Sequence, residues 1–412
     1  MNAKVSFYKK LFLFAIFSLS TLHAEVFRFS FSEGDTYRIN SFVQEDVYIN
    51  MAFSHTAEIT NRITVDVSDV QSPENEPSSA LFTCTFMTSE KNSKGENFNW
   101  SKQYPSVFRR DEFGNYTISN QYFMPIVRNV PVFPEHDLAI GDTWTGDGHE
   151  AHDFRDVFGL KDPYIVPFTV TYTYKGPTVK DGYNLQLITA EYHLIYELPT
   201  ELVRKHYPST QLFPVKTLGT SKQNLYWDVE IGNLRMYDEE FNIRLILNTG
   251  DVCDFVGIAH AVITDLKTLD KKKTVDDVNR KIDELGLSNI QVKETDEGVT
   301  ISIENIQFTP DSAILLPSEL EKLDKLALVL QEYAERDLLI TGHTALAGTK
   351  EGRDRLSLER ANAVAQYLIQ KGVREDHRVF TQGFGADRPV APNDTEENRA
   401  KNRRVEITII DK

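Results

Sequence analysis

The sequence predicts an α+β chain of several domains, in which a large antiparallel β domain precedes a smaller domain that mixes helices and strands. Three observations support this prediction. Apolar and polar residues alternate in short runs from residue 25 to about residue 265, which is the pattern of half-buried strands. Helical periodicity becomes clear only after residue 274, directly behind three consecutive lysines. The 412 residues are enough for two or three domains with cores of their own.

Residues 1–24 are predicted to be an export signal. Three lysines lie among the first ten residues, an apolar run follows from Leu11 to Leu22, and Ala24 is a small residue suited to cleavage. The apolar run is shorter than the roughly 20 residues that a membrane-spanning helix needs. We therefore expect a cleaved signal peptide and an exported protein.

Residues 25–265 are predicted to form the β domain. Runs that alternate, or that are rich in β-branched residues, occur at 27–31, 59–67, 80–87, 168–174, 183–198, 224–229 and 243–247. Prolines within 124–144 exclude central strands from that stretch. The pattern indicates one antiparallel β domain, or two that pack closely together.

Two interpretations of this β domain stay open. It is either a soluble periplasmic domain or an outer-membrane β-barrel with the rest of the chain as its periplasmic tail. Charged residues interrupt the candidate lipid-facing rows, as at Asp228 and Glu230, and this favours the soluble domain.

Residues 266–273 are predicted to be a solvated linker, and residues 274–412 a second domain. We expect its first helix to begin at Thr274 and to end at Gly286, and a second helix to begin at Ser318 with Glu321 in a capping box. A third helix is expected over 354–371, and strands over 290–294, 299–308, 338–341, 378–383 and 403–410. Strands separated by helices of this length favour a sheet with helices packed on one face.

Several separated motifs of this second domain resemble one known family. They are Gly342-His343-Thr344, Leu356-Ser357, Arg360-Ala361, Gly383-Phe384-Gly385, Pro389, Asn393 and Asn402-Arg403-Arg404-Val405-Glu406. Their order and spacing are similar to those of the OmpA C-terminal family, over residues 300–412 and more weakly from 274. The resemblance implies a βαβαββ sandwich, a periplasmic location associated with the outer membrane, and non-covalent binding to peptidoglycan.

The resemblance also implies a binding site for the diamino acid of the peptidoglycan stem peptide. In the family, an Asp after His-Thr accepts hydrogen bonds from the ligand's ammonium, and an Arg fifteen residues later binds its carboxylate. The Arg is present as Arg360, but Ala345 stands in place of the Asp, and Arg353 in place of an Asn. The expected peptidoglycan-binding residues are Arg360, Thr344, Ala345, Arg353, Leu356, Asn402 and Arg403.

These departures leave alternatives open. Another carboxylate, from Glu351, Asp354 or Asp387, replaces the missing Asp, or the local wall carries a different diamino acid, or the domain has lost wall binding and now serves as a protein-interaction scaffold. In each case the β domain either contacts an outer-membrane or periplasmic protein partner or holds an apolar ligand.

Other functions find little support in the sequence. A net charge of −16 argues against a nucleic-acid partner. One loop gathers potential metal ligands without the spacing of a known metal motif, so we expect a surface loop and no metal: Asp147, His149, His152, Asp153 and Asp156. We expect no cofactor and no catalytic site. Cys84 and Cys253 are either a disulfide or two free thiols.

Overall fold

The computed structural model describes residues 24–92, 97–100, 103–201, 211–265, 269–309 and 312–411. The predicted export signal lies outside these residues, apart from Ala24 at its end. No helix in the described part of the chain is long and apolar enough to cross a membrane.

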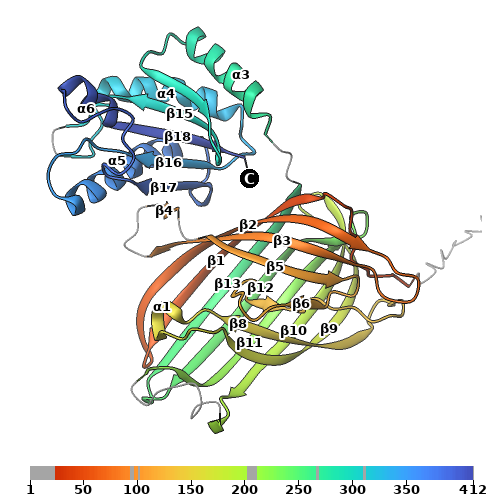
Figure 1. The fold of residues 1–412 in the computed structure, drawn as a ribbon. Coiled ribbons are helices and arrows are strands. Elements are labelled where there is room, and N and C mark those ends of the chain that lie inside the picture. The colour runs from red at the N-terminus through yellow and green to blue at the C-terminus, as the bar shows by residue number, and fades with distance from the viewer. Residues whose placement is uncertain are drawn as a thin grey trace, which may run out of the picture.

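The β domain is one antiparallel sheet of twelve strands with a short helix, α1 (Arg155–Phe158). Its strands are β1 (Thr36–Ile49), β2 (Ala52–Gln71), β3 (Ser79–Asn92), β5 (Gln103–Asp111), β6 (Tyr116–Ile118), β7 (Val127–Arg128), β8 (Thr143–His152), β9 (Tyr164–Lys180), β10 (Tyr183–Glu197), β11 (Pro214–Asp228), β12 (Asn233–Leu247) and β13 (Val252–Asp265). Their order across the sheet is β6-β5-β3-β2-β1-β13-β12-β11-β10-β9-β8-β7. The sheet curls strongly, so that β1 to β3 arch opposite β8 to β11 (Figure 1).

Alternation along the strands decides which side chains face the inside of this curl. In β9, Val166 and Val170 are buried, whereas Thr169 and Thr171 between and beyond them are exposed. Successive side chains of a strand point to opposite faces, so along β9 the inner row is apolar and the outer row mostly polar.

The strand expected at residues 27–31 is absent, and this part of the prediction is wrong. Phe27 and Phe29 do alternate into the core. The backbone N–H of Phe29 bonds to the carbonyl of Glu112, whereas that of Ser30 bonds to the carbonyl of Gly232. The segment therefore lies across two separate parts of the chain and forms no continuous ladder with either.

The C-terminal domain contains α3 (Lys271–Glu284), β14 (Ile290–Glu294), β15 (Gly298–Glu304), α4 (Pro317–Gln331), β16 (Leu338–Gly342), α5 (Lys350–Gln370), the 3₁₀ helix η1 (Asp376–Arg378), β17 (Val379–Gly383), α6 (Glu396–Asn402) and β18 (Arg404–Ile410). Helices α3, α4 and α5 pack on one face of its sheet. The layout differs from the expected βαβαββ sandwich, because α6 separates β17 from β18, and β14 extends the sheet beyond β15.

Two helix starts also differ from the prediction. Helix α3 begins at Lys271 because the carboxylate of Asp270 accepts a hydrogen bond from the N–H of Lys273. The three lysines therefore lie in the first turn of α3 and not in a linker, and Thr274 is buried within the helix. Helix α4 begins at Pro317, without a side-chain cap, so the capping box at Ser318 is wrong. Proline suits a first helical position, where its missing N–H would have no partner.

One strand of the C-terminal sheet comes from the β domain. The connection between β3 and β5 contributes β4 (Phe98–Asn99), which pairs parallel with β17 and completes a sheet of order β14-β15-β18-β16-β17-β4. Phe98 packs with Met87 against Leu339, Phe380 and Ile410, on the sheet face opposite the helices. The β domain thus covers part of that face, and the predicted boundary near residue 265 does not separate the two domains in space.

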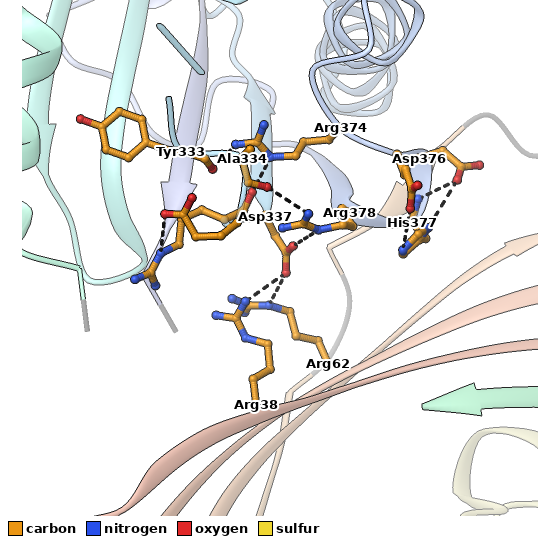
Figure 2. A network of polar contacts seen from close by, with 12 residues as sticks. Arg38, Arg62, Tyr333, Ala334, Asp337, Arg374, Asp376, His377 and Arg378 are labelled. Carbon is orange, nitrogen blue, oxygen red and sulfur yellow. Dashed lines mark hydrogen bonds and ion pairs between the residues drawn. The ribbon is translucent and has the colours of Figure 1, made fainter. Parts of the chain in front are cut away.

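A buried ion-pair network reinforces this contact (Figure 2). Asp337, from the C-terminal domain, accepts hydrogen bonds from Arg38 of β1 and Arg62 of β2, at 3.3 and 3.0 Å, and from Arg378 at 2.9 Å. All four residues come from separate segments, and three of them are almost fully buried. The network therefore holds the C-terminal domain against the outer face of β1 and β2.

Both cysteines are free thiols in this structure. Cys84 lies on β3 and Cys253 on β13, with β1 and β2 between these strands.

Candidate ligand-binding site

The candidate site lies where β16 passes into α5, around the first motif that carries the family resemblance. The strand ends at Gly342, where a side chain would collide with helix α5: a Cβ would lie 1.9 Å from the carbonyl oxygen of Ser357. Glycine is therefore required for the close packing of β16 against α5.

His343 has a structural role in this arrangement. It is 2% exposed, stacks on Phe384, and lies 3.5 Å from the carboxylate of Glu406 through its Nε2. Burial, with help from the charge of Arg404, lowers the pKa of His343, so the ring is neutral at pH 7. It therefore fixes the end of β16 to β18 and does not present a charge to a ligand.

Thr344 and Ala345 follow directly. The N–H of Thr344 donates to the carbonyl of Gly385, and its side-chain hydroxyl is buried without a hydrogen-bond partner among the described residues. Ala345 is also buried and offers only a methyl group. The position that the family fills with a carboxylate thus has an unused hydroxyl beside it.

Asn402 and Asn393 shape the loop opposite. Asn402 is 1% exposed, and its carboxamide accepts from the N–H groups of Val390 and Ala391. It also donates to Asn393, which accepts from the N–H of Leu346. Asn402 therefore positions the loop from inside the protein and does not reach the surface.

Arg353 lies in the first turn of α5, which begins after the N-cap residue Thr349. Its Nη1 donates to the carbonyl of Gly348 at 2.7 Å, while its Nε is buried without a partner among the described residues. The guanidinium is therefore only partly satisfied by the protein.

Arg360 lies two turns further along α5, roughly 10 Å along the helix axis. Its guanidinium carbon is 4.8 Å from the ring centre of Phe308, and its Nε donates to the carbonyl of Ser312 at 3.3 Å. A cation stacked on an aromatic ring in this way keeps its orientation while remaining charged.

The remaining predicted residues lie around this helix. Leu356 is half-buried in α5, and Arg403 pairs with Glu396 at 2.6 Å. Lys350 forms ion pairs with both Asp354 and Asp387, at 3.0 and 2.9 Å. Two of the three carboxylates considered as replacements for the missing Asp therefore already share an ion-pair partner, and Glu351 is exposed.

The site as a whole offers cationic side chains. Arg353 and Arg360 present guanidinium groups, which suit carboxylates because two parallel N–H donors match the two oxygens. Whether these side chains and Thr344, Ala345, Leu356, Asn402 and Arg403 contact a ligand stays a prediction.

Sequence reasoning missed Phe308 and Lys350 as parts of this site. Phe308 is 52 positions before Arg360, and nothing in the spacing indicates that the two stack. The spacing of Lys350 and Asp354 does predict their ion pair, because residues four apart on a helix are neighbours.

The potential metal ligands do not form the expected surface loop, because Asp147, His149 and His152 belong to strand β8, and their side chains separate when the chain folds. His152 lies 2.8 Å from Glu150 inside the curled sheet, Asp147 accepts from Thr169 on the outer face, and Asp153 pairs with Arg155. No three acidic, histidine or cysteine side chains among the described residues form a cluster suited to a metal ion.

Comparison with known proteins places the C-terminal domain in a family. Residues 307–403 match the OmpA family. The chain is 36% identical over 128 residues to "Probable lipoprotein YiaD" of Escherichia coli (strain K12), covering 31% of this chain and 58% of that protein. It is 41% identical over 104 residues to "Peptidoglycan-binding protein ArfA" of Mycobacterium bovis, covering 25% of this chain and 32% of that protein.

A solved structure of an outer membrane protein from Borrelia burgdorferi B31 is 35% identical. The match covers 29% of this chain and 96% of the Borrelia burgdorferi chain, with a TM-score of 0.25. The curated matches thus span about half or less of those relatives' own lengths, and they fall in the C-terminal part of this chain. The C-terminal domain described here belongs to the OmpA family.

Proposed function

We propose that this protein is a non-enzymatic envelope protein whose C-terminal domain binds peptidoglycan non-covalently, through carboxylates of the stem peptide. The position of Arg360 is the observation that carries the proposal. Its guanidinium keeps the motif spacing and is oriented by the ring of Phe308. The similarity to a relative named as a peptidoglycan-binding protein supports the same assignment.

We expect this binding to be weaker than in relatives that carry the Asp. Ala345 offers no acceptor for a ligand ammonium, and Lys350 already forms ion pairs with both Asp354 and Asp387. Loss of one partner of a desolvated charge pair costs about 2–5 kcal/mol, which corresponds to roughly 30-fold to several thousand-fold in affinity. Arg353 adds a positive charge near the position of a ligand ammonium.

Co-sedimentation of residues 25–412 with purified peptidoglycan tests the proposal. The whole described chain is needed, because β4 and Arg62 of the β domain complete the C-terminal domain. We expect the native protein to sediment, R360A to lose binding, and R360K to recover only part of it, since lysine keeps the charge without the fork. Equal sedimentation of native protein and R360A contradicts the proposed ligand contact.

A second candidate function is a protein-interaction scaffold that has lost wall binding. Ala345 and Arg353 favour it. It predicts that the native protein stays in the supernatant, and that the double variant A345D/R353N sediments. If neither protein sediments, the domain does not recognise this ligand class at all.

We further propose that the β domain lies in the periplasm and links the wall to another envelope component. Part of its outer face is polar: β12 places Asp238, Glu240 and Asn242 on the face opposite its mainly apolar inner row. Carbonate extraction of membranes tests this location. Release into the supernatant is expected, whereas retention in the pellet supports the alternative in which the sheet itself lies in the outer membrane.

A further inference from the structure

The curled sheet of the β domain forms a partly open cavity of about 510 Å³. Two apolar clusters, one around Trp227 and one around Phe82 and Phe108, lie towards the same end of the sheet and both contact Phe31. The cavity adjoins these clusters at Leu194 and Phe86 and lies against the inner faces of β1, β2, β3, β8 and β10 to β13. A volume of this size is typical of pockets that hold small organic molecules.

The two edge strands of the sheet, β6 and β7, are connected only indirectly among the described residues. Within the described ladders, β6 and β7 do not pair with each other. The N–H of Tyr116 instead bonds to the side chain of Asn129, and the N–H of Phe133 to the carbonyl of Phe113. The segment Met124–Val127 lines the cavity on this side, and Ser106 holds it through the carbonyl of Met124.

Most of the cavity wall is apolar. Rows of apolar side chains from four neighbouring strands face it, and several of them are only half-buried: Ile39, Val43, Ile59, Ile63, Ile243 and Phe255. Apolar residues on the inner face of a sheet normally bury one another. Their remaining exposed surface faces the cavity, where an apolar ligand would cover it.

A group of acidic residues stands at one part of this wall. Glu150 is 2% exposed, accepts a hydrogen bond from the hydroxyl of Tyr192 at 3.0 Å, and lies 2.8 Å from Nε2 of His152. Glu239 accepts from Ser221 and Gln223, both through Oε1. Its Oε2 has no partner among the described residues, and Glu239 lines the cavity.

The cavity therefore has an excess of hydrogen-bond acceptors. Glu45 also lines it, two strands from Glu239, and no lysine or arginine of the described chain does. Burial, with repulsion from Glu90, raises the pKa of Glu45 to about 7. Burial also raises the pKa of Glu239, and the hydrogen bonds from Ser221 and Gln223 offset this only in part. Glu150 has His152 beside it, whereas no cationic side chain of the described residues pairs with Glu45 or Glu239. Carboxylates buried without a cation favour a ligand that supplies one, and when ionised they repel an anionic head.

We propose that this cavity binds a single-chain amphiphile with a hydrogen-bond-donating head, preferentially a protonated amine, with the head at Glu239 and Glu150 and the chain along the aliphatic rows. The site is separate from the candidate wall site on α5. It gives the β domain a ligand of its own, in addition to the proposed link to the wall.

Binding of three probes with the same chain and different heads tests this proposal: dodecylamine, dodecanol and laurate. They are titrated below their micellar concentrations into residues 25–412 at pH 7.5. We expect the amine to bind at least about tenfold more tightly than laurate, with the alcohol between them, because hydrogen bonds to charged groups are the stronger ones. Laurate binding as tightly as the amine overturns the proposal.

Matched variants assign the site. E239Q keeps the shape of the side chain and should remove most of the preference for the amine, whereas E240Q, on the outer face of the same strand, should leave it unchanged. I243W on β12 and V43W on β1 fill the cavity from two strands of its wall and should reduce binding of all three probes at least about tenfold, while I258W, on the exposed face of β13, should not. Unchanged binding in both cavity-filling variants, or equal effects of E239Q and E240Q, overturns the assignment.

Discussion

Arg62 of the β domain and Asp337 of the C-terminal domain form a buried ion pair, with 3.0 Å between Nε of the arginine and Oδ2 of the aspartate. The two residues are 275 positions apart in the sequence. Burial alone would raise the pKa of Asp337, but Arg62, Arg38 and Arg378 together outweigh it and hold this pKa below its ordinary value. The carboxylate is thus charged at neutral pH. Removing one partner of such a group costs more than its formation contributes, because the others stay buried without compensation.

The first prediction concerns this carboxylate. D337N leaves Arg38, Arg62 and Arg378 without a counter-charge, so we expect a loss of about 3–5 kcal/mol in the free energy of unfolding. Urea denaturation of residues 25–412 measures it. D324N removes an exposed partner of Lys371 in the same domain and should change stability by less than about 1 kcal/mol. Equal effects of the two variants would show that the network contributes nothing beyond a surface pair.

The second prediction concerns the strand that crosses between the domains. Phe98 is 0% exposed, and F98A removes its ring from the apolar cluster at β17, at a cost of about 3–5 kcal/mol. We expect faster hydrogen exchange in β4 and β17, where the N–H of Trp100 bonds to the carbonyl of Thr381. N99A, on the exposed side of β4, is the control. Unchanged exchange at β17 in F98A contradicts this role of β4.

The third prediction concerns acid stability. Burial alone would raise the pKa of Glu406, but His343 and Arg404 outweigh it and lower this pKa from 4.5 to about 2. The contribution of Glu406 is therefore complete above about pH 4.5 and is lost as the pH falls towards 2. Linkage predicts a loss of about 2 kcal/mol between pH 5 and pH 3 from this group. E406Q lacks the titrating group, so its unfolding free energy should fall by correspondingly less over the same interval. An equal fall in unfolding free energy between pH 5 and pH 3 in both proteins would contradict this assignment to Glu406.

The fourth prediction concerns the thiols. Burial raises the pKa of Cys84 to about 12, and Cys84 is almost fully buried, so it should resist alkylation in the folded protein. Cys253 is half-exposed and should react slowly, because its pKa is also raised by burial. Mass spectrometry after iodoacetamide treatment should find one adduct on native protein and two on unfolded protein. No adduct on non-reduced, unfolded protein would indicate a disulfide.

Local patterns were sufficient for much of the C-terminal domain. The strand expected over 290–294 is present as β14, and those over 338–341, 378–383 and 403–410 begin or end within one residue of β16, β17 and β18. In the β domain, the runs at 59–67, 80–87 and 168–174 lie inside β2, β3 and β9. These segments alternate regularly or are fully buried, and such signals depend only on near neighbours.

Contacts between segments far apart in the sequence could not be predicted from local patterns. Strand β4 has two residues, too few for any periodicity, and its partner β17 lies about 280 positions away. Asp337 stands one residue before a buried strand, and nothing in its surroundings identifies Arg38 and Arg62 as its partners. The burial of Asn402 could not be predicted for a related reason, since its place in a family motif does not tell whether its side chain faces a ligand or the protein.

The pairing of β4 with β17 limits how C-terminal domains can be exchanged between related proteins. A C-terminal domain transplanted from another protein onto this β domain would meet two arginines, Arg38 and Arg62, and would need an acidic residue where Asp337 stands. It would also need an open strand edge to accept Phe98 and Asn99. The two halves of this chain are therefore expected to have been inherited together rather than shuffled as independent modules.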